Sequence, residues 1–280
     1  MPKISVVMSV YNGEAYLEEA IESVRNQTFG DWELIVVNDC SADSTGEILA
    51  GFASKDRRIK VYTNEVNLRL PASLNKAVSL CSGKYIARMD ADDICLPYRL
   101  EKQYDFMEKH RDVSLSSCRF MTLKNGVYAS GGAGGRCDNN ALRAMLLVSN
   151  PILHPGVIAR ADVMRDLNYD ETLTCTEDLE LWTRMAMENK KMQILPECLL
   201  IYRLHGKQIT STTLERQHTE VLKVQQKYYA SLLEKMSGEM QEFYISGIYF
   251  KEYTDIHKFV EYARWLKRAA AENFDGRDID

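Results

Sequence analysis

Short strand-like runs alternate with helical periodicity through the first half of this 280-residue chain, and this alternation limits its fold more than any other feature. The strand-like runs are residues 4–10, 34–37, 59–62 and 85–89. Between the first two runs, apolar residues recur at the spacing of one helix face, at Leu17, Ala20, Ile21 and Val24. Such alternation is typical of βαβ units, whose helices pack on a mostly parallel sheet. We therefore predict an α/β fold.

Capping and turn residues indicate where these elements begin and end. Ser44 and Glu47 have the capping-box spacing and predict the start of a helix. A further apolar stripe comprises Leu74, Ala77, Val78 and Cys81. Gly83 follows this stripe and is predicted to be the helix C-cap. The pattern then predicts a helix over residues 99–109 and a strand over residues 113–121.

The second half of the chain is less regular. The Gly-rich residues 130–135 are not a phosphate loop, because no Gly-Lys-Ser or Gly-Lys-Thr follows them. A helix is expected from about Glu177, with one apolar face formed by Leu179, Trp182, Met185 and Ala186. Past about residue 211 the chain reads as helical, with a stripe at Ile256, Phe259, Val260 and Ala263. Core packing is the default role of such a stripe, while a homo-oligomer interface and a peripheral membrane contact stay open.

Composition narrows the class of protein. With 280 residues, 45% of them hydrophobic, the chain can form one large domain and a smaller appendage. A net charge of -5 argues against general nucleic-acid binding, because that depends on clustered Lys and Arg. The 7 cysteines form no C-x-x-C pair and no apolar run approaches the ~20 residues of a membrane span. We expect a cytoplasmic protein with reduced thiols, compatible with contact at the inner face of a membrane.

Three carboxylates follow the strand-like run at residues 85–89. Asp90, Asp92 and Asp93 are too close together to be ionised at low cost unless a cation lies among their oxygens. The alternative is a solvated turn, since Asp favours loop positions. The sequence therefore suggests a metal site that could also hold a nucleotide through its phosphates.

Five motifs in fixed order connect this chain with a known family. They are residues 6–14 (VVMSVYNGE), 36–41 (VVNDCS), 89–93 (MDADD), 177–184 (EDLELWTR) and 202–205 (YRLH). Together they closely resemble the family 2 glycosyltransferases of the GT-A fold, over roughly residues 3–212. Because the five motifs occur together, the resemblance is far more specific than any one of them.

The resemblance implies a Rossmann-like GT-A domain over residues 1–211, with a mostly parallel central sheet flanked by helices. Residues 1–98 would be its nucleotide-binding half, residues 99–211 its acceptor-binding half, and residues 212–280 a C-terminal helical extension. It implies an inverting hexosyl- or N-acetylhexosaminyl-transferase that uses a nucleoside diphosphate sugar, in the first place a UDP-sugar, and Mn²⁺ or Mg²⁺. The acceptor would be a hydroxyl of a glycan or lipid-linked glycan, in surface polysaccharide synthesis.

On the donor side, the resemblance implies four contacts with the nucleotide. Val10 and Tyr11 match the end of the first strand, which packs against the base, and Asp39 matches an acidic residue that contacts it. Arg69 stands where many members of the family have glycine, and its side chain could reach the base or the phosphates. Cys40 also replaces a common glycine, which raises the question whether its turn needs a positive φ.

The resemblance also implies the metal site. Asp90 and Asp92 match the D-x-D motif, in which one carboxylate reaches the ribose or metal and the other binds the metal. Asp93 would support them. His205 matches a histidine that approaches the metal or diphosphate in some relatives, although a lone histidine is equally well explained as a hydrogen-bonded structural residue.

On the acceptor side, Asp178 matches the catalytic base, in the first turn of a helix with Thr176 as expected N-cap. The helix dipole favours the ionised form of Asp178, which is the form able to accept a proton. The alternative is that Asp178 only stabilises the helix N-terminus through the dipole. Glu177 would bind the acceptor or support its neighbour. His154, in the segment 150–156, and Trp182 could line the acceptor pocket, although a rigid turn and core packing explain them as well.

Two other classes of function stay open at this point. A sugar nucleotidyltransferase shares the α/β nucleotide-binding layout, but the segment from Tyr11 to Glu14 lacks its Gly-rich phosphate loop. A catalytically inactive module that only binds nucleotide sugars is the second. The donor sugar, the acceptor and the linkage are not specified by any residue pattern in the sequence.

Overall fold

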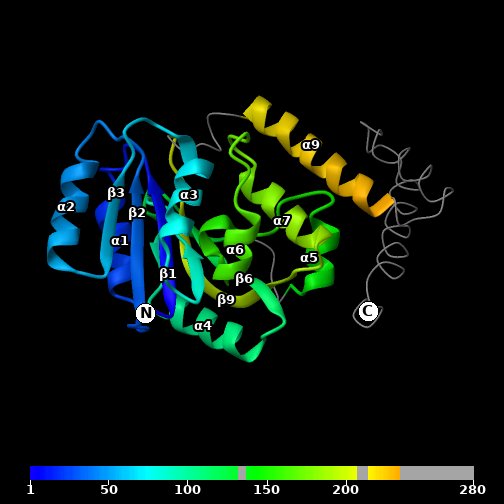
Figure 1. The fold of residues 1–280 in the computed structure, drawn as a ribbon, viewed down its shortest axis with the longest axis horizontal. Coiled ribbons are helices and arrows are strands. Elements are labelled where there is room, and N and C mark those ends of the chain that lie inside the picture. Colours follow the sequence, from blue (N-terminus) through cyan, green and yellow to red (C-terminus); the bar gives the residue numbers. More distant parts are fainter. Residues whose placement is uncertain (132–136, 207–213, 234–280) are drawn as a thin grey trace.

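The computed structural model describes residues 1–131, 137–206 and 214–233 (Figure 1). Its first half contains β1 (Ile4–Val10), α1 (Leu17–Arg25), β2 (Trp32–Asn38), α2 (Thr45–Lys55), β3 (Ile59–Thr63), α3 (Arg69–Leu80), β4 (Tyr85–Arg88) and β5 (Ile94–Cys95). It continues with α4 (Arg99–Lys109), β6 (Val113–Lys124), β7 (Val127–Gly131), α5 (Asn139–Met145), η1 (His154–Gly156), β8 (Ile158–Arg160), α6 (Ala161–Leu167), α7 (Glu177–Met187), β9 (Lys191–Arg203) and α9 (Leu214–Leu233). The predicted α/β alternation is confirmed, with boundaries within a few residues.

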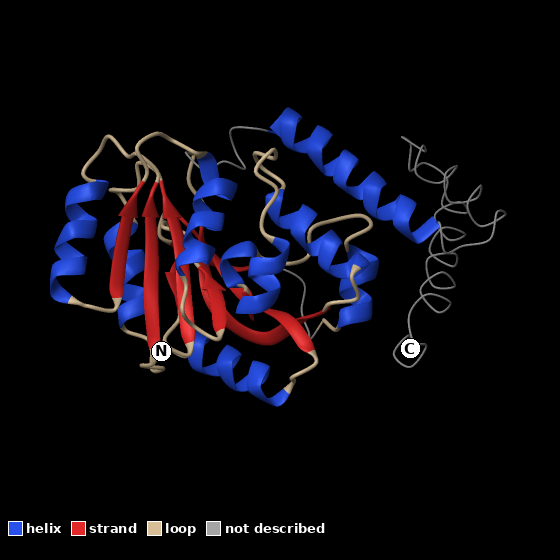
Figure 2. Cartoon of the chain, viewed as in Figure 1, coloured by secondary structure: helices blue, strands red, loops and turns tan. Residues whose placement is uncertain are grey.

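One sheet runs through the described part of the molecule (Figure 2). Its strand order is β3-β2-β1-β4-β8-β6-β9-β5, with β7 paired to β6. The strands β3, β2, β1 and β4 are parallel, as the first half of the sequence predicts. The second half adds antiparallel pairs at β8, β7 and β5, so the sheet as a whole is mixed.

Helices cover both faces of the sheet, because alternate residues of each strand point to opposite sides. Val7 and Ile35 belong to a core packed against α3, α6 and α7, whereas Val6 and Leu34 belong to a second core packed against α1, α2 and α4. Successive strand residues are therefore apolar, as expected for strands buried on both faces. This arrangement holds the carboxyl ends of β1, β2 and β4 rigidly at one edge.

The structure confirms one predicted helix end and corrects another. Ser44 occupies the N-cap position of α2, but its side chain makes no capping bond, and the Oδ1 atom of Asp43 accepts from the Thr45 amide at 3.0 Å instead. Helix α3 ends at Leu80 with Cys81 as its C-cap, so Gly83 is not the cap. Gly83 is needed for close packing, since a Cβ atom there would lie 2.6 Å from the Ser5 nitrogen.

The C-terminal extension is described only in part. Helix α9 confirms helical structure over residues 214–233, while the predicted stripe at residues 256–263 lies outside the described residues. The Gly-rich stretch begins within β7, and residues 132–136 also lie outside them. All seven cysteines are free thiols. None of the helices described is long and apolar enough to span a bilayer.

Candidate functional site

The ends of β1 and β2 form the first part of the candidate site. Val10 is buried and its carbonyl accepts from the Asp39 amide at 2.8 Å, while Tyr11 directly after it is 55% exposed. The Asp39 side chain is buried, and its Oδ1 atom accepts from Asn64 Nδ2 and from the Leu68 amide, each at 2.8 Å. Asp39 therefore fixes the loop before α3 beside the exposed Tyr11.

Both residues that replace a common glycine lie in the left-handed region. Cys40 has φ 62° and Arg69 has φ 71°. The structure thus answers the question raised by Cys40: its turn does adopt a positive φ. Arg69 is the first residue of α3 and its side chain is exposed on the same edge as Tyr11. These backbone conformations cost energy for any residue with a Cβ atom.

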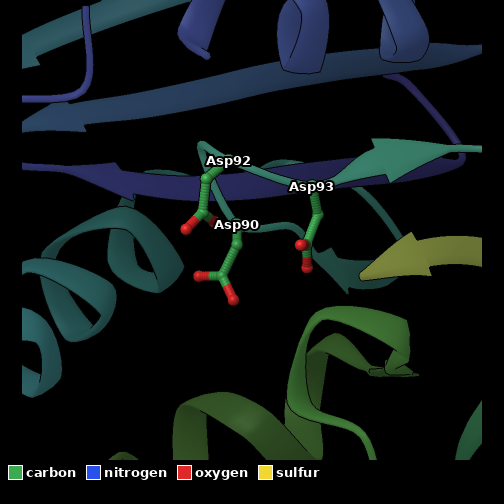
Figure 3. A group of neighbouring side chains, drawn as sticks. All are labelled: Asp90, Asp92 and Asp93. Atoms are coloured by element: carbon green, nitrogen blue, oxygen red, sulfur yellow. The ribbon is translucent and has the colours of Figure 1, made fainter. Parts of the chain in front are cut away.

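The three aspartates predicted from the sequence meet directly after β4. One carboxylate oxygen from each of Asp90, Asp92 and Asp93 lies within 4.8 Å of the others. Figure 3 shows the three side chains extending to the same side of the loop. Burial raises the pKa of Asp90 and raises that of Asp93 well above its usual range, and in both cases the neighbouring carboxylates add to the increase.

These residues fit a divalent cation. Asp93 is fully buried, and while its Oδ1 atom accepts from the Arg203 amide at 2.9 Å, its Oδ2 atom has no hydrogen-bond partner. Such an orphaned buried oxygen is costly unless a proton or a cation compensates for it. Clustered carboxylate oxygens are the ligands that Mg²⁺ and Mn²⁺ prefer.

The loop after β9 reaches the same cluster. His205 Nε2 lies 2.8 Å from Asp92 Oδ2, and its ring lies against Tyr16 with the centroids 4.9 Å apart. Arg203 donates through Nε to the Asp92 carbonyl at 2.8 Å. The structure therefore brings His205 to the acidic cluster, as the motif order suggests.

Asp178 lies in the first turn of α7, half-buried. Its Oδ2 atom accepts from Asn150 Nδ2 and its Oδ1 atom from the Leu179 amide, each at 2.7 Å. Burial raises its pKa, and these two hydrogen bonds, with Arg88, offset part of the effect. Thr176 occupies the N-cap position as predicted, but its side chain does not cap the helix.

Glu177, His154 and Trp182 are buried, which favours the structural roles that the sequence left open for them. Burial raises the pKa of Glu177 to about 7 and lowers that of His154 well below its usual value. The 3.7 Å between His154 Nδ1 and Glu177 Oε1 therefore joins a neutral imidazole to the carboxyl group and is not an ion pair. Trp182 is 0% exposed and packs edge-on against His154, so both support the site from within the core.

Arg88 joins the two sets of carboxylates and was not singled out from the sequence. Its buried guanidinium forms an ion pair with Asp90, and its charge also offsets part of the rise in the pKa of Glu177 and Asp178. Its Nε atom has no hydrogen-bond partner. The signal that could have found it is a charged residue inside the otherwise apolar run YIARM, immediately before the aspartates.

Ligands of α/β proteins bind beyond the carboxyl ends of the parallel strands, and the acidic cluster lies at that edge here, with the Asp178 carboxylate at the start of α7. The comparisons give the family. The sequence profile described as glycosyl transferase family 2 matches residues 5–156, and the chain belongs to this family. Asp178 and α9 lie beyond the matched segment.

Curated relatives extend the similarity over most of the chain. An uncharacterized glycosyltransferase of Methanocaldococcus jannaschii is 34% identical over 252 residues, which is 89% of this chain and 84% of that protein. The O-antigen biosynthesis glycosyltransferase WbnJ of Escherichia coli is 34% identical over 215 residues, or 75% of this chain and 83% of the relative. The putative teichuronic acid biosynthesis glycosyltransferase TuaG of Bacillus subtilis is 30% identical over 75% of this chain and 82% of its own.

Among solved structures, residues 1–349 of S. aureus TarS in complex with UDP-GlcNAc superpose with a TM-score of 0.69. The similarity covers 98% of this chain and 83% of the TarS chain at 19% sequence identity, so it supports the fold. The GT-A type of α/β fold expected from the motifs is thereby confirmed.

Proposed function

We propose that this protein is an inverting glycosyltransferase that moves a hexosyl or N-acetylhexosaminyl group from a UDP-sugar to a hydroxyl of a glycan or lipid-linked glycan. The observation that carries the proposal is the meeting of the aspartate cluster and Asp178 around Arg88, in a chain of glycosyl transferase family 2. The relatives named for O-antigen and teichuronic acid biosynthesis support surface polysaccharide synthesis as its setting. A cytoplasmic location is part of the proposal. The TarS complex with UDP-GlcNAc supports a UDP-sugar.

In this proposal the donor nucleotide lies along the ends of β1 and β2. Tyr11 offers an exposed ring for the base to pack against, beside Val10. Asp39 contacts the base or holds the loop that does, since its Oδ1 atom bonds the Leu68 amide. Arg69 is exposed on this edge, and its side chain is long enough for the guanidinium group to reach an anionic phosphate.

Asp90 and Asp92 would hold the Mn²⁺ or Mg²⁺ ion, with Asp93 behind them and His205 beside Asp92. When bound, such an ion offsets the negative charge that develops on the leaving diphosphate. His205 and Arg203 keep the Asp92 segment in place from the other side of the loop. The protein's own contribution here is a set of oxygen ligands arranged before the donor arrives.

Asp178 would accept the proton of the acceptor hydroxyl. The hydroxyl oxygen then forms the new bond to the anomeric carbon, and the bond to the diphosphate breaks with its electron pair on the departing phosphate. Attack from the face opposite the leaving group makes an α-linked donor give a β-linked product. Asn150 and the Leu179 amide orient the carboxylate for this step. Its raised pKa makes it a stronger base once ionised.

The first test is donor binding. We expect titration calorimetry to detect one of UDP, GDP, dTDP and CDP, with UDP preferred, and only when Mn²⁺ is present. Asp92→Ala should weaken that binding at least about tenfold, since it removes a charged oxygen ligand. Asp105→Ala, which removes an exposed carboxylate on α4, serves as the control. Binding that is indifferent to Mn²⁺, or to the loss of Asp92, would contradict the metal assignment.

The second test is turnover. Transfer of labelled sugar from the donor to a lipid-linked glycan fraction, or to water, should be detectable for the wild type. Asp178→Asn keeps the shape of the side chain but cannot accept the proton, so we expect a loss of about 10²–10⁴-fold in turnover with unchanged donor affinity. Unaltered turnover would remove Asp178 as the base. A wild type that binds the donor but turns nothing over would instead be an inactive binding module.

A further inference from the structure

Helix α9 lies beside α7 and contacts the segment immediately before it (Figure 1). Glu220 of α9 accepts hydrogen bonds from three consecutive residues of that segment. Its Oε1 atom accepts from the Thr174 hydroxyl at 2.9 Å, and its Oε2 atom from the Thr176 hydroxyl at 3.1 Å. The Cys175 thiol, at 3.4 Å, and the Thr174 amide, at 3.3 Å, also point to Oε2. The Glu220 carboxylate therefore accepts hydrogen bonds from every residue of the 174–176 turn that leads into α7.

This turn determines where α7 begins. The Thr176 carbonyl accepts the first helical bond, from the Glu180 amide at 3.0 Å, while its side chain is bonded to Glu220 instead of capping the helix. Asp178 is the second residue of α7, so a shift of the turn moves its carboxylate. The Leu179 amide, within the helix, and the Asn150 side chain, outside it, donate hydrogen bonds that orient that carboxylate.

Helix α9 itself packs into the core formed by α7 and its neighbours. Val224, Tyr228 and Tyr229 are buried in the core that also contains Trp182 of α7. The Tyr228 hydroxyl donates to the Arg143 carbonyl of α5 at 3.3 Å. Buried aromatic residues on one side of the helix therefore hold Glu220 at a fixed distance from the turn.

We propose that Glu220 is a positioning residue, which holds the 174–176 turn so that Asp178 faces the acceptor hydroxyl in the geometry needed for proton transfer. Glu220 touches neither donor nor acceptor and acts through Thr174 and Thr176. The proposal rests on the proposed function, because it presumes that Asp178 is the base. It gives α9 a part in catalysis beyond packing.

The experiment compares Glu220→Ala and Glu220→Gln with Gln226→Ala, which alters an exposed residue of the same helix. For Glu220→Ala we expect kcat to fall by about 10²-fold, the size of effect that a displacement of about 1 Å can produce. Donor affinity and its Mn²⁺ dependence should stay within about twofold of wild type, since Asp39 and Asp92 lie on other elements. Glu220→Gln retains one acceptor oxygen, so its kcat should lie between those of Glu220→Ala and the wild type. The kcat of Gln226→Ala should match that of the wild type.

A double-mutant cycle separates positioning from general loss of structure. Thr174→Val combined with Glu220→Ala should be no slower than Glu220→Ala alone, because both remove the same contact. A normal kcat in Glu220→Ala would overturn the proposal, as would a loss of donor affinity as large as the loss of kcat. If Glu220→Ala does not fold, Glu220→Gln is judged by the same two criteria. A wild type without turnover would refute the proposed function itself. That outcome differs from failure of the Glu220 proposal, in which the wild type is active and Glu220→Ala is equally active.

Discussion

At the scale of single residues, this chain places side chains where the backbone favours glycine. Cys40 and Arg69 both have a positive φ next to the proposed nucleotide site. Cys40 makes one polar contact that helps it there, from Sγ to the Glu65 carbonyl at 3.5 Å. The motif comparison in the sequence could indicate these positions, but only the backbone geometry shows that the strain is present.

We expect Cys40→Gly to be more stable than Cys40→Ala by about 1 kcal/mol, because only glycine adopts φ 62° without a steric cost. Both variants lose the thiol contact, so the difference between them isolates the backbone. Chemical denaturation of the two variants measures it. Equal stabilities would mean that the turn relaxes when the cysteine is removed.

Glu177 provides a prediction about pH. Its pKa rises from an ordinary value of 4.5 to about 7 in the folded protein, because it is buried and faces Asp178 and Asp90, with Arg88 offsetting part of the effect. The folded state therefore holds a proton that the unfolded state has released, and stability decreases as pH rises from 4.5 to about 7. We expect Glu177→Gln to remove about 3 kcal/mol of this decrease. Denaturation curves at pH 5 and pH 8 measure it, with the exposed Glu188→Gln as control. A wild-type slope in Glu177→Gln would refute the assignment.

At the scale of elements, local sequence patterns predicted the strands and helices well because each depends on neighbouring residues. The apolar stripe of α1 and the whole of α4 were predicted correctly. One error concerned the end of α3, where Gly83 was predicted to be the C-cap. A glycine is required at that position because of its close contact with Ser5 of β1. A glycine after a helical stripe is expected both at a helix C-cap and where two backbone segments pack closely, so the sequence alone could not distinguish these two roles.

We expect Gly83→Ala to destabilise the protein by about 1–3 kcal/mol, because its Cβ atom would lie 2.6 Å from the Ser5 nitrogen of β1 and force β1 and the turn apart. Gly51→Ala is the matched control. Apart from its chain neighbours and the adjacent backbone of α2, no atom lies within 4 Å of a Cβ atom there, and Gly51 is inside α2, so alanine should stabilise the helix by up to about 1 kcal/mol. Effects of the same sign in both variants would contradict this account.

At the scale of the whole molecule, Arg88 links acidic groups that come from distant segments of the chain. It comes from β4, pairs with Asp90, and offsets part of the rise in the pKa of Glu177 and Asp178 on α7. The positive charge of Arg88 stabilises the ionised forms of Asp90, Glu177 and Asp178. Removing it leaves them without a counter-charge in a region of low dielectric constant.

We expect Arg88→Met to lower the free energy of unfolding by about 3–5 kcal/mol at pH 8, as when one partner of a buried pair is removed. The loss should be smaller at pH 5, where the Glu177 carboxyl group, with its pKa of about 7, is protonated and no longer needs the positive charge of Arg88. Urea denaturation at both pH values measures this. The exposed Arg57→Met should change stability by less than about 0.5 kcal/mol. An equal loss at both pH values would show that packing, not charge, is the cause.

The sequence by itself determined the alternating elements of the first half, the helices α4 and α7, the aspartate cluster and the family, because these are carried by periodicity and by residues adjacent in the chain. The tertiary structure alone decided which distant groups meet. His205 reaches Asp92 across 113 residues, Arg203 reaches Asp93 across 110, and Glu220 reaches Thr176 across 44. Such contacts depend on how strands are ordered in the sheet and on how α9 packs, and no local pattern of apolar and polar residues encodes them.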